Sequence, residues 1–143
     1  MQITRKILRH IIKEALHISP SRSNFIILES NSKKLYAEVA DSDHLRNKGL
    51  MYRTALDEDC GMLFSFTSPA IQSFWMKNTL IPLSIAFINE SGKIINIEDL
   101  KPHSLKNVYS LSPVKFALEM KKGWFQENCI HPGSIVRGLS GII

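Results

Sequence analysis

Short apolar runs alternate with turn-forming residues from residue 25 onward, and no apolar run is longer than four residues. Strands of globular proteins are commonly five or six residues long, and Gly, Pro, Asn and Ser between them mark turns. This spacing predicts a mainly β fold with several short strands and short helices. We expect these strands to form a compact, barrel-like or closed antiparallel domain, with an α+β arrangement as the alternative.

Two turns and one capped helix give this expectation local detail. Residues 30–32 (Ser-Asn-Ser) and 90–92 (Glu-Ser-Gly) each predict a hairpin. A short helix over 42–49 is expected to start at Asp41 or Ser42 and to end at Gly49. A helical turn is expected over 122–128, and 101–112 is expected to be irregular. The expected strands are 25–29, 34–40, 61–66, 72–78, 83–89, 93–98, 114–120 and 134–137.

The first part of the chain differs from the rest in charge. Residues 1–34 hold seven Lys or Arg and two Asp or Glu, whereas residues 35–143 hold eleven of each. Apolar residues recur at helical spacing over 3–17, which predicts a basic amphipathic helix. We therefore divide the chain into a helical extension with a linker, 1–23, and a single β-rich domain, 24–143.

The helix over 3–17 has three candidate partners. Its apolar face is suited to docking on the domain or on another protein, and its basic face is suited to an anionic membrane surface. Nucleic acid is the least favoured partner, because the bases are few and no aromatic residue lies among them for stacking on bases.

Several function classes lack their sequence signals. A membrane-spanning helix needs about 20 mainly apolar residues, and a secretory signal needs about 7–15 near the start; neither pattern is present. The phosphate-binding loop motif and the His-x-x-x-His zinc motif are absent as well. We expect a cytoplasmic protein, peripheral to a membrane if the helix binds one, with no cofactor and no metal.

Residues 73–83 (Ser-Phe-Trp-Met-Lys-Asn-Thr-Leu-Ile-Pro-Leu) are the most informative stretch. In a strand, Trp75, Lys77 and Thr79 would share one side. They would then line a pocket, where Trp75 could stack on a ring and Lys77 could bind a carboxylate or phosphate. The alternative is that this segment only packs the core, with Asn78 and Thr79 making turn hydrogen bonds.

Arg53 follows a second motif, Gly-Leu-Met-Tyr-Arg at 49–53. It could place a second cation beside Lys77 for an anionic ligand. An equally suitable partner is an acid of the run 57–59, which would form a surface ion pair of little energy.

Carboxylates provide the enzymatic alternative. Glu119 or Asp41 acting with Lys77 would support a hydrolase-like reaction, since a carboxyl can serve as a general acid or base. Their spacing does not single out a pair. A Ser-His-Asp triad lacks the Gly-x-Ser-x-Gly signature that would support it.

Several motifs follow one another in a characteristic order and spacing. They are Val-Ala-Asp at 39–41, residues 49–53, Gly-Met-Leu-Phe at 61–64, residues 73–79, Ile-Pro-Leu at 81–83, Leu-Glu at 118–119, and Gly123. Together they resemble a bacterial and archaeal family, the domain of unknown function 192, over about residues 35–138. The resemblance implies a small, mostly β domain with short helices, and it implies no activity. Relatives typically carry Asp after Ile-Pro-Leu, where this chain has Ser84.

Three hypotheses for function follow. The preferred one is a non-catalytic module that binds a small polar or anionic ligand, or a partner, through Arg53, Trp75, Lys77, Asn78, Thr79 and Glu119. The second is the hydrolase-like enzyme. The third is a structural or interaction domain in which the motif only specifies the fold.

Overall fold

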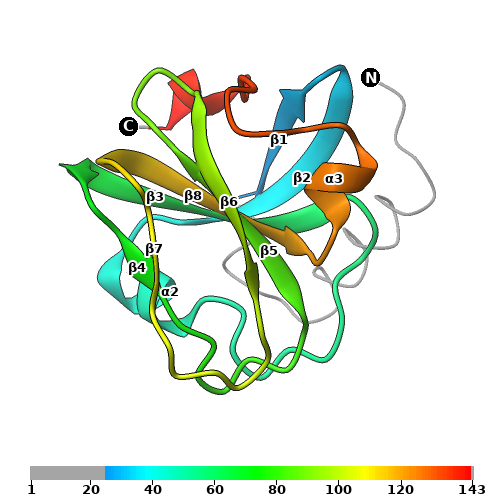
Figure 1. Cartoon of the computed structure of the whole chain (residues 1–143), viewed down its shortest axis with the longest axis vertical. Helices are drawn as coiled ribbons and strands as arrows, with labels where there is room; N and C mark the ends of the chain where they lie inside the picture. Colours follow the sequence, from blue (N-terminus) through cyan, green and yellow to red (C-terminus); the bar gives the residue numbers. More distant parts are fainter. Residues whose placement is uncertain (1–24, 143) are drawn as a thin grey trace.

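The computed structural model describes residues 25–142 (Figure 1). The helix expected over 3–17 therefore lies outside the described residues. Within them the chain is mainly β, as predicted. The elements are β1 (Phe25–Ser30), β2 (Lys33–Ala40), α2 (Asp43–Lys48), β3 (Cys60–Ala70), β4 (Ser73–Phe74), β5 (Leu83–Ile88), β6 (Ile94–Leu100), β7 (Val108–Tyr109), β8 (Val114–Lys121), α3 (Trp124–Glu127) and the short 3₁₀ helix η2 (Leu139–Gly141).

The main sheet has six strands in the order β1-β2-β3-β8-β5-β6 and is not closed. The prediction of a closed or barrel-like antiparallel domain is therefore wrong, because β1 and β6 are edge strands that do not pair with each other. The sheet is also mixed, since β2 and β3 run parallel. Parallel neighbours need a crossover of about a dozen residues or more. Residues 41–59, which include α2, provide that crossover.

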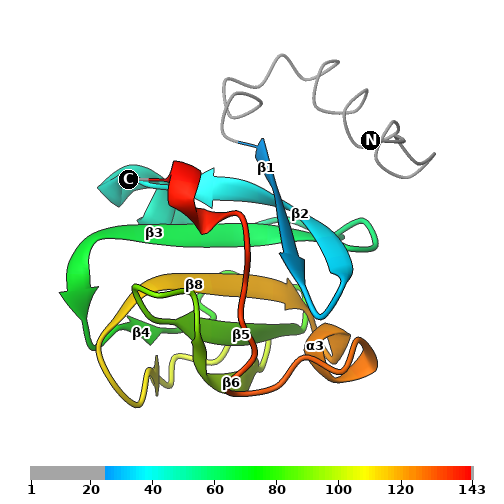
Figure 2. The ribbon, with the colours of Figure 1, turned by 90° about the horizontal axis from the view of Figure 1, so that it is seen from above.

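The C-terminal segment crosses between the two edges of the open sheet. At one edge the backbone amide of Arg137 donates to the Glu29 carbonyl at 2.7 Å, and at the other the amide of Val136 donates to the Gly92 carbonyl at 2.8 Å. Figure 2 shows this segment running across the sheet from β6 to β1. The strand expected over 134–137 forms only isolated bridges there, because each of its sides meets a different strand.

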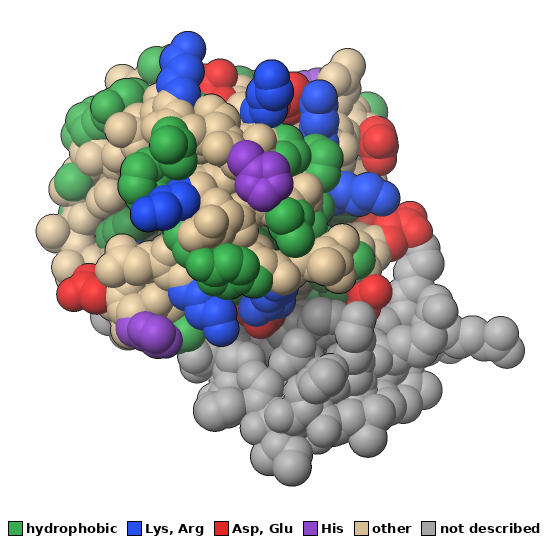
Figure 3. Space-filling model, turned by 90° about the horizontal axis from the view of Figure 1, so that it is seen from below, with side chains coloured by type: hydrophobic (Ala, Val, Ile, Leu, Met, Phe, Trp, Pro, Cys, Tyr) green, Lys and Arg blue, Asp and Glu red, His purple; other side chains and the backbone are tan. Residues whose placement is uncertain are grey.

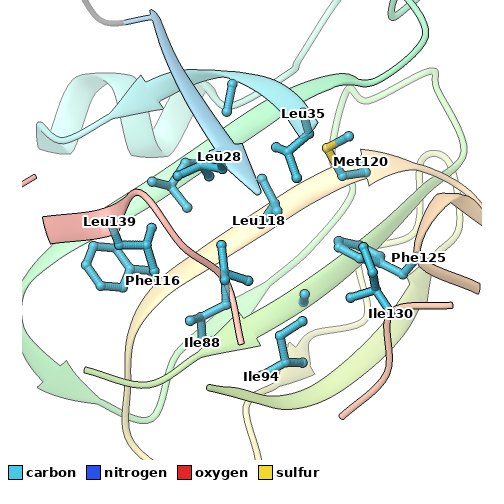
Figure 4. Close-up of a cluster of buried hydrophobic side chains, with 14 of the residues drawn as sticks. Leu28, Leu35, Ile88, Ile94, Phe116, Leu118, Met120, Phe125, Ile130 and Leu139 are labelled. Carbon is cyan, nitrogen blue, oxygen red and sulfur yellow. The ribbon is translucent and has the colours of Figure 1, made fainter. Parts of the chain in front are cut away.

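Both faces of the sheet are covered. One face packs a cluster that includes Leu35, Phe116 and Leu118 against α3 and the C-terminal segment (Figure 4). The other face carries a second cluster, with Met62, Phe64 and residues of β5. All six residues of β5 are buried, which explains why its sequence is nearly continuous in apolar residues rather than alternating.

The local predictions met different outcomes. The helix over 42–49 is confirmed: Ser42 caps α2 by accepting from the Leu45 amide, and Gly49 ends it at φ 50°. The strand over 72–78 is wrong beyond β4, because the backbone of Met76 turns away and donates to the Ser104 carbonyl at 2.8 Å. The irregular segment 101–112 contains β7, which pairs with β4 in a small second sheet.

Candidate functional site

A cavity of about 730 Å³ lies on the second face of the sheet, between α2, β3 and β4. Its size is in the range of small-molecule sites, about 300–1,000 Å³. The lining combines aromatic, hydroxyl, amide, basic and carboxyl side chains. The lining residues are Asp43, Arg46, Asn47, Lys48, Gly49, Leu50, Met51, Phe64, Phe66, Thr67, Ser68, Ala70, Gln72, Ser73, Phe74, Trp75, Lys77, Asn78, Thr79 and Glu119.

Six residues of the stretch 73–83 line this pocket. Two of them form β4, and the other four, Trp75, Lys77, Asn78 and Thr79, follow it in a loop rather than continuing the strand. Trp75 is 45% exposed and Thr79 is 5% exposed. The Lys77 ammonium nitrogen lies 5.4 Å from the centre of the Trp75 ring, a cation–π distance. The Thr79 hydroxyl donates to the Lys77 carbonyl at 3.1 Å. The alternative interpretation predicts this local turn bond, and the same segment also lines the cavity.

Asn78 holds the pocket loop in place. Its side-chain amide donates to the Tyr52 hydroxyl at 2.9 Å, and the Tyr52 backbone amide donates to the Asn78 carbonyl at 2.9 Å. Both residues have positive φ, 54° for Asn78 and 66° for Tyr52. Asn tolerates this region better than most residues. The two bonds tie the motif at 49–53 to the motif at 73–79, so two stretches that the sequence singles out separately belong to one site.

Glu119 supplies the pocket's buried carboxyl. It is 4% exposed, and it lies in a cross-strand row with Met62 on β3 and Ile85 on β5. Cross-strand partners share a face of the sheet, which places Glu119 on the pocket side. Among the described residues its side chain has no hydrogen bond or ion pair. Burial raises the pKa of Glu119 to about 8, because desolvation disfavours the charged form.

Arg53 does not line the pocket. Its guanidinium makes two hydrogen bonds to the Glu38 carboxylate, one of them from Nη2 to Oε1 at 2.9 Å. Glu38 is buried on the same row of the sheet as Met62. The pairing was missed at the sequence level because Glu38 stands in an apolar strand with no motif around it. A bidentate Arg–carboxylate pair is a strong interaction and anchors the crossover to β2.

Two other sequence-level candidates lie away from the pocket. Asp41 is exposed and does not line the cavity that Lys77 lines. Ser84 is on the opposite face of the sheet, where its hydroxyl donates to Asp99 at 3.0 Å and accepts from the Gly123 amide at 3.0 Å. The position where relatives typically carry Asp therefore lies outside this pocket.

Helix α2 contributes two cations that the sequence did not single out. Lys48 is exposed at the pocket, and Arg46 is bound to Asp43 at 2.9 Å and stacks over Phe66 at 5.7 Å. The basic last turn of this helix was the available signal. Across the pocket, Phe64 and Phe74 meet edge to face with ring centres 4.8 Å apart.

Figure 3 shows the end of the molecule where the loops joining β4 to β5 and β6 to β7 lie. Hydrophobic and basic side chains are interspersed over the middle of this surface, and Asp and Glu lie toward its edge. Residues 60–89 and 100–118, which include both loops, contain no acidic residue. The surroundings of Lys77 therefore favour anions over cations.

Two structural features are absent from residues 25–142. That part of the chain holds no cluster of three His, Cys, Asp or Glu side chains suited to a metal. It also holds no helix with the length and apolar character to cross a membrane. Cys60 is a buried free thiol and Cys129 an exposed one.

A comparison with known families identifies the relationship. The model of the domain of unknown function 192, described as an uncharacterized ACR, matches residues 26–138. This chain belongs to that family. The family match begins in β1 and ends next to η2, so it covers all of the sheet except the first residue of β1, and it includes the pocket.

Two solved structures are similar to this chain. A protein from Sinorhizobium meliloti, named as a candidate transcription regulator, is 36% identical with a TM-score of 0.75 over 80% of this chain and 92% of its own. A protein of unknown function from Novosphingobium aromaticivorans is 30% identical with a TM-score of 0.73 over 80% of this chain and 84% of its own. No curated protein matches this chain.

Proposed function

We propose that this domain is a non-catalytic binding module for a small polar or anionic ligand. The observation that carries the proposal is that one cavity gathers Trp75, Lys77, Asn78, Thr79 and Glu119 from two separate parts of the chain. Concave sites with apolar walls and a few convergent polar groups are the usual form of small-molecule sites. The site we propose excludes Arg53, which is bound to Glu38.

The hydrolase-like alternative receives less support from the pocket. Glu119 has the raised pKa of a general acid. The other carboxylate in the lining, Asp43, is bound to Arg46, and Asp41 does not line the cavity. The described residues of the pocket thus provide no second free carboxylate to act as a base or nucleophile.

A role in transcription, taken from the name of the Sinorhizobium protein, is not part of the proposal. Residues 35–143 carry equal numbers of basic and acidic residues, whereas nucleic-acid binding depends on a net basic surface that neutralises phosphates. Docking of residues 3–17 on a protein or a membrane stays a prediction.

A thermal-shift screen with small organic anions tests the proposal. A ligand that binds only the folded state stabilises it, by about 2.7 kcal/mol at 100 times its Kd. We expect stabilising compounds whose effect is reduced in Lys77→Ala and kept in Lys122→Ala, since Lys122 is equally exposed and does not line the pocket. A screen without stabilising compounds, or hits that respond equally to both variants, would contradict the proposal.

A further inference from the structure

The carboxyl of Glu119 has an environment that the rest of the fold does not explain. It is 4% exposed, it lines the pocket, and it has no hydrogen-bond or ion-pair partner among the described residues. Leaving a buried polar group without a partner costs about 1–3 kcal/mol. Buried Glu38, by contrast, is satisfied by Arg53. Within residues 25–142, the pocket therefore contains a buried polar group that is left without a partner and that a molecule entering the pocket could satisfy.

The charge state of Glu119 decides which atom of a ligand can satisfy it. With a pKa of about 8, the carboxyl keeps its proton at neutral pH and can donate an O–H hydrogen bond. The fitting partner is an acceptor such as a carbonyl oxygen. An amine would need the ionised carboxylate, and the exposed Lys48 and Lys77 at the same pocket disfavour a cation there.

The aromatic side chains and the exposed lysines of the pocket indicate which other groups the ligand carries. Phe64 is buried and Phe74 partly buried, and their edge-to-face contact supplies an apolar part of the lining that also holds the buried carboxyl and the exposed lysines. Lys48 and Lys77 are the pocket's exposed cations, since Arg46 is bound to Asp43. An apolar body and an anionic group would meet complementary surfaces.

Resting on the proposed function, we infer that the ligand is a small organic carboxylate with a carbonyl group. Its carbonyl oxygen accepts a hydrogen bond from the Glu119 carboxyl, its apolar body lies against Phe64 and Phe74, and its carboxylate lies beside Lys48 and Lys77.

Three matched probes separate these contacts. Benzoylpropionate carries a ring, a ketone and a carboxylate; phenylbutyrate has the same skeleton without the ketone oxygen; butyrophenone keeps the ketone and lacks the carboxylate. Binding is measured by heteronuclear NMR titration near pH 6, where Glu119 is protonated. We expect benzoylpropionate to bind about fivefold more tightly than phenylbutyrate, the usual effect of one net hydrogen bond, with shifts at Phe64 and Phe74.

Variants assign the effect to Glu119. Glu119→Met removes the donor and keeps the chain length, so the preference for the ketone should disappear; an apolar replacement at a buried site should not unfold the domain. Glu119→Gln keeps an N–H donor and should keep the preference. Lys77→Met should weaken the binding of both carboxylate probes equally and leave the binding of butyrophenone unchanged.

The experiment distinguishes a failure of the inference about Glu119 from a failure of the proposed function. If benzoylpropionate and phenylbutyrate bind the pocket equally well in the wild-type protein and in Glu119→Met, the inference about Glu119 is overturned while pocket binding stands. If none of the three probes binds up to its solubility limit, both the inference and the proposed function are overturned for this ligand class.

Discussion

Glu38 and Glu119 lie on one cross-strand row with Met62 between them, yet their surroundings differ. Glu38 is bound by Arg53, whereas Glu119 has no partner among the described residues. An ion pair stabilises the charged form of a carboxyl, and burial without a partner stabilises the neutral form. Two identical side chains therefore acquire different roles, one holding the crossover to the sheet and one facing the pocket.

The pH dependence of stability should report on Glu119. Its pKa is about 8 in the folded protein against an ordinary value of 4.5, so between these values the unfolded chain releases a proton that the folded protein keeps. The contribution of Glu119 to the free energy of unfolding is therefore greatest below about pH 4.5, and it falls as the pH rises toward 8. The free energy of unfolding of the wild type, relative to Glu119→Gln, should fall by about 1.4 kcal/mol per pH unit in this window.

Urea unfolding at several pH values measures this difference. Other titrating groups are shared by the two proteins and cancel in the comparison. Above about pH 8 the difference should become constant, because the folded protein is then ionised as well. If the free energies of unfolding of the two proteins changed equally with pH from 5 to 8, Glu119 would be ionised in the folded state.

Among the elements, the pairing of β3 with β8 positions the pocket, since β3 supplies Phe64 and β8 supplies Glu119. Gly61 allows this pairing to be close. A Cβ atom there would lie 2.1 Å from the Glu119 carbonyl oxygen and 2.4 Å from the Met120 sulfur. The side chain of Met120 can move, whereas the carbonyl belongs to the sheet backbone.

We therefore expect Gly61→Ala to destabilise the protein by about 3 kcal/mol, the upper part of the usual range for overpacking. Gly141→Ala is the matched control, because a Cβ there meets no atom within 4 Å and its φ is not positive. Thermal unfolding of both variants measures the effect. Equal melting temperatures for Gly61→Ala and the wild type would show that β3 and β8 can separate without cost.

At the scale of the whole molecule, the C-terminal segment connects the two open edges of the sheet and covers one core. Val136 and Leu139 are buried in that core, at 4% and 7% exposure. Each buried side chain of this kind contributes about 1.5–3 kcal/mol. The total is large against the usual stability of a small domain, about 5–15 kcal/mol.

Deleting residues 134–143 should therefore abolish cooperative unfolding or lower the melting temperature steeply. Loss of the near-ultraviolet circular dichroism of buried Trp124 would accompany it. Ile135→Ala is the control, since Ile135 is 46% exposed and surface changes usually stay within about 0.5 kcal/mol. A truncated protein with wild-type stability would show that the segment does not contribute to the stability of the fold.

The sequence by itself determined the mainly β class, the two hairpins, the cap at Ser42 and the end of α2 at Gly49, because each depends on residues near one another in the chain. It also identified five of the residues that line the pocket, since unusual polar and aromatic residues stand out locally. These signals need no knowledge of distant contacts.

Only the tertiary structure decided the parallel β2–β3 pair, the open sheet, the partner of Arg53 and the isolation of Glu119. Each of these depends on which strands become neighbours across long connections. Side-chain alternation assigns a residue to a face of its own strand and does not say which strand lies beside it. For that reason the sequence could not distinguish the surroundings of Glu38 from those of Glu119, whereas in the fold Glu38 forms an ion pair with Arg53 and Glu119 is a buried carboxyl that lines the pocket.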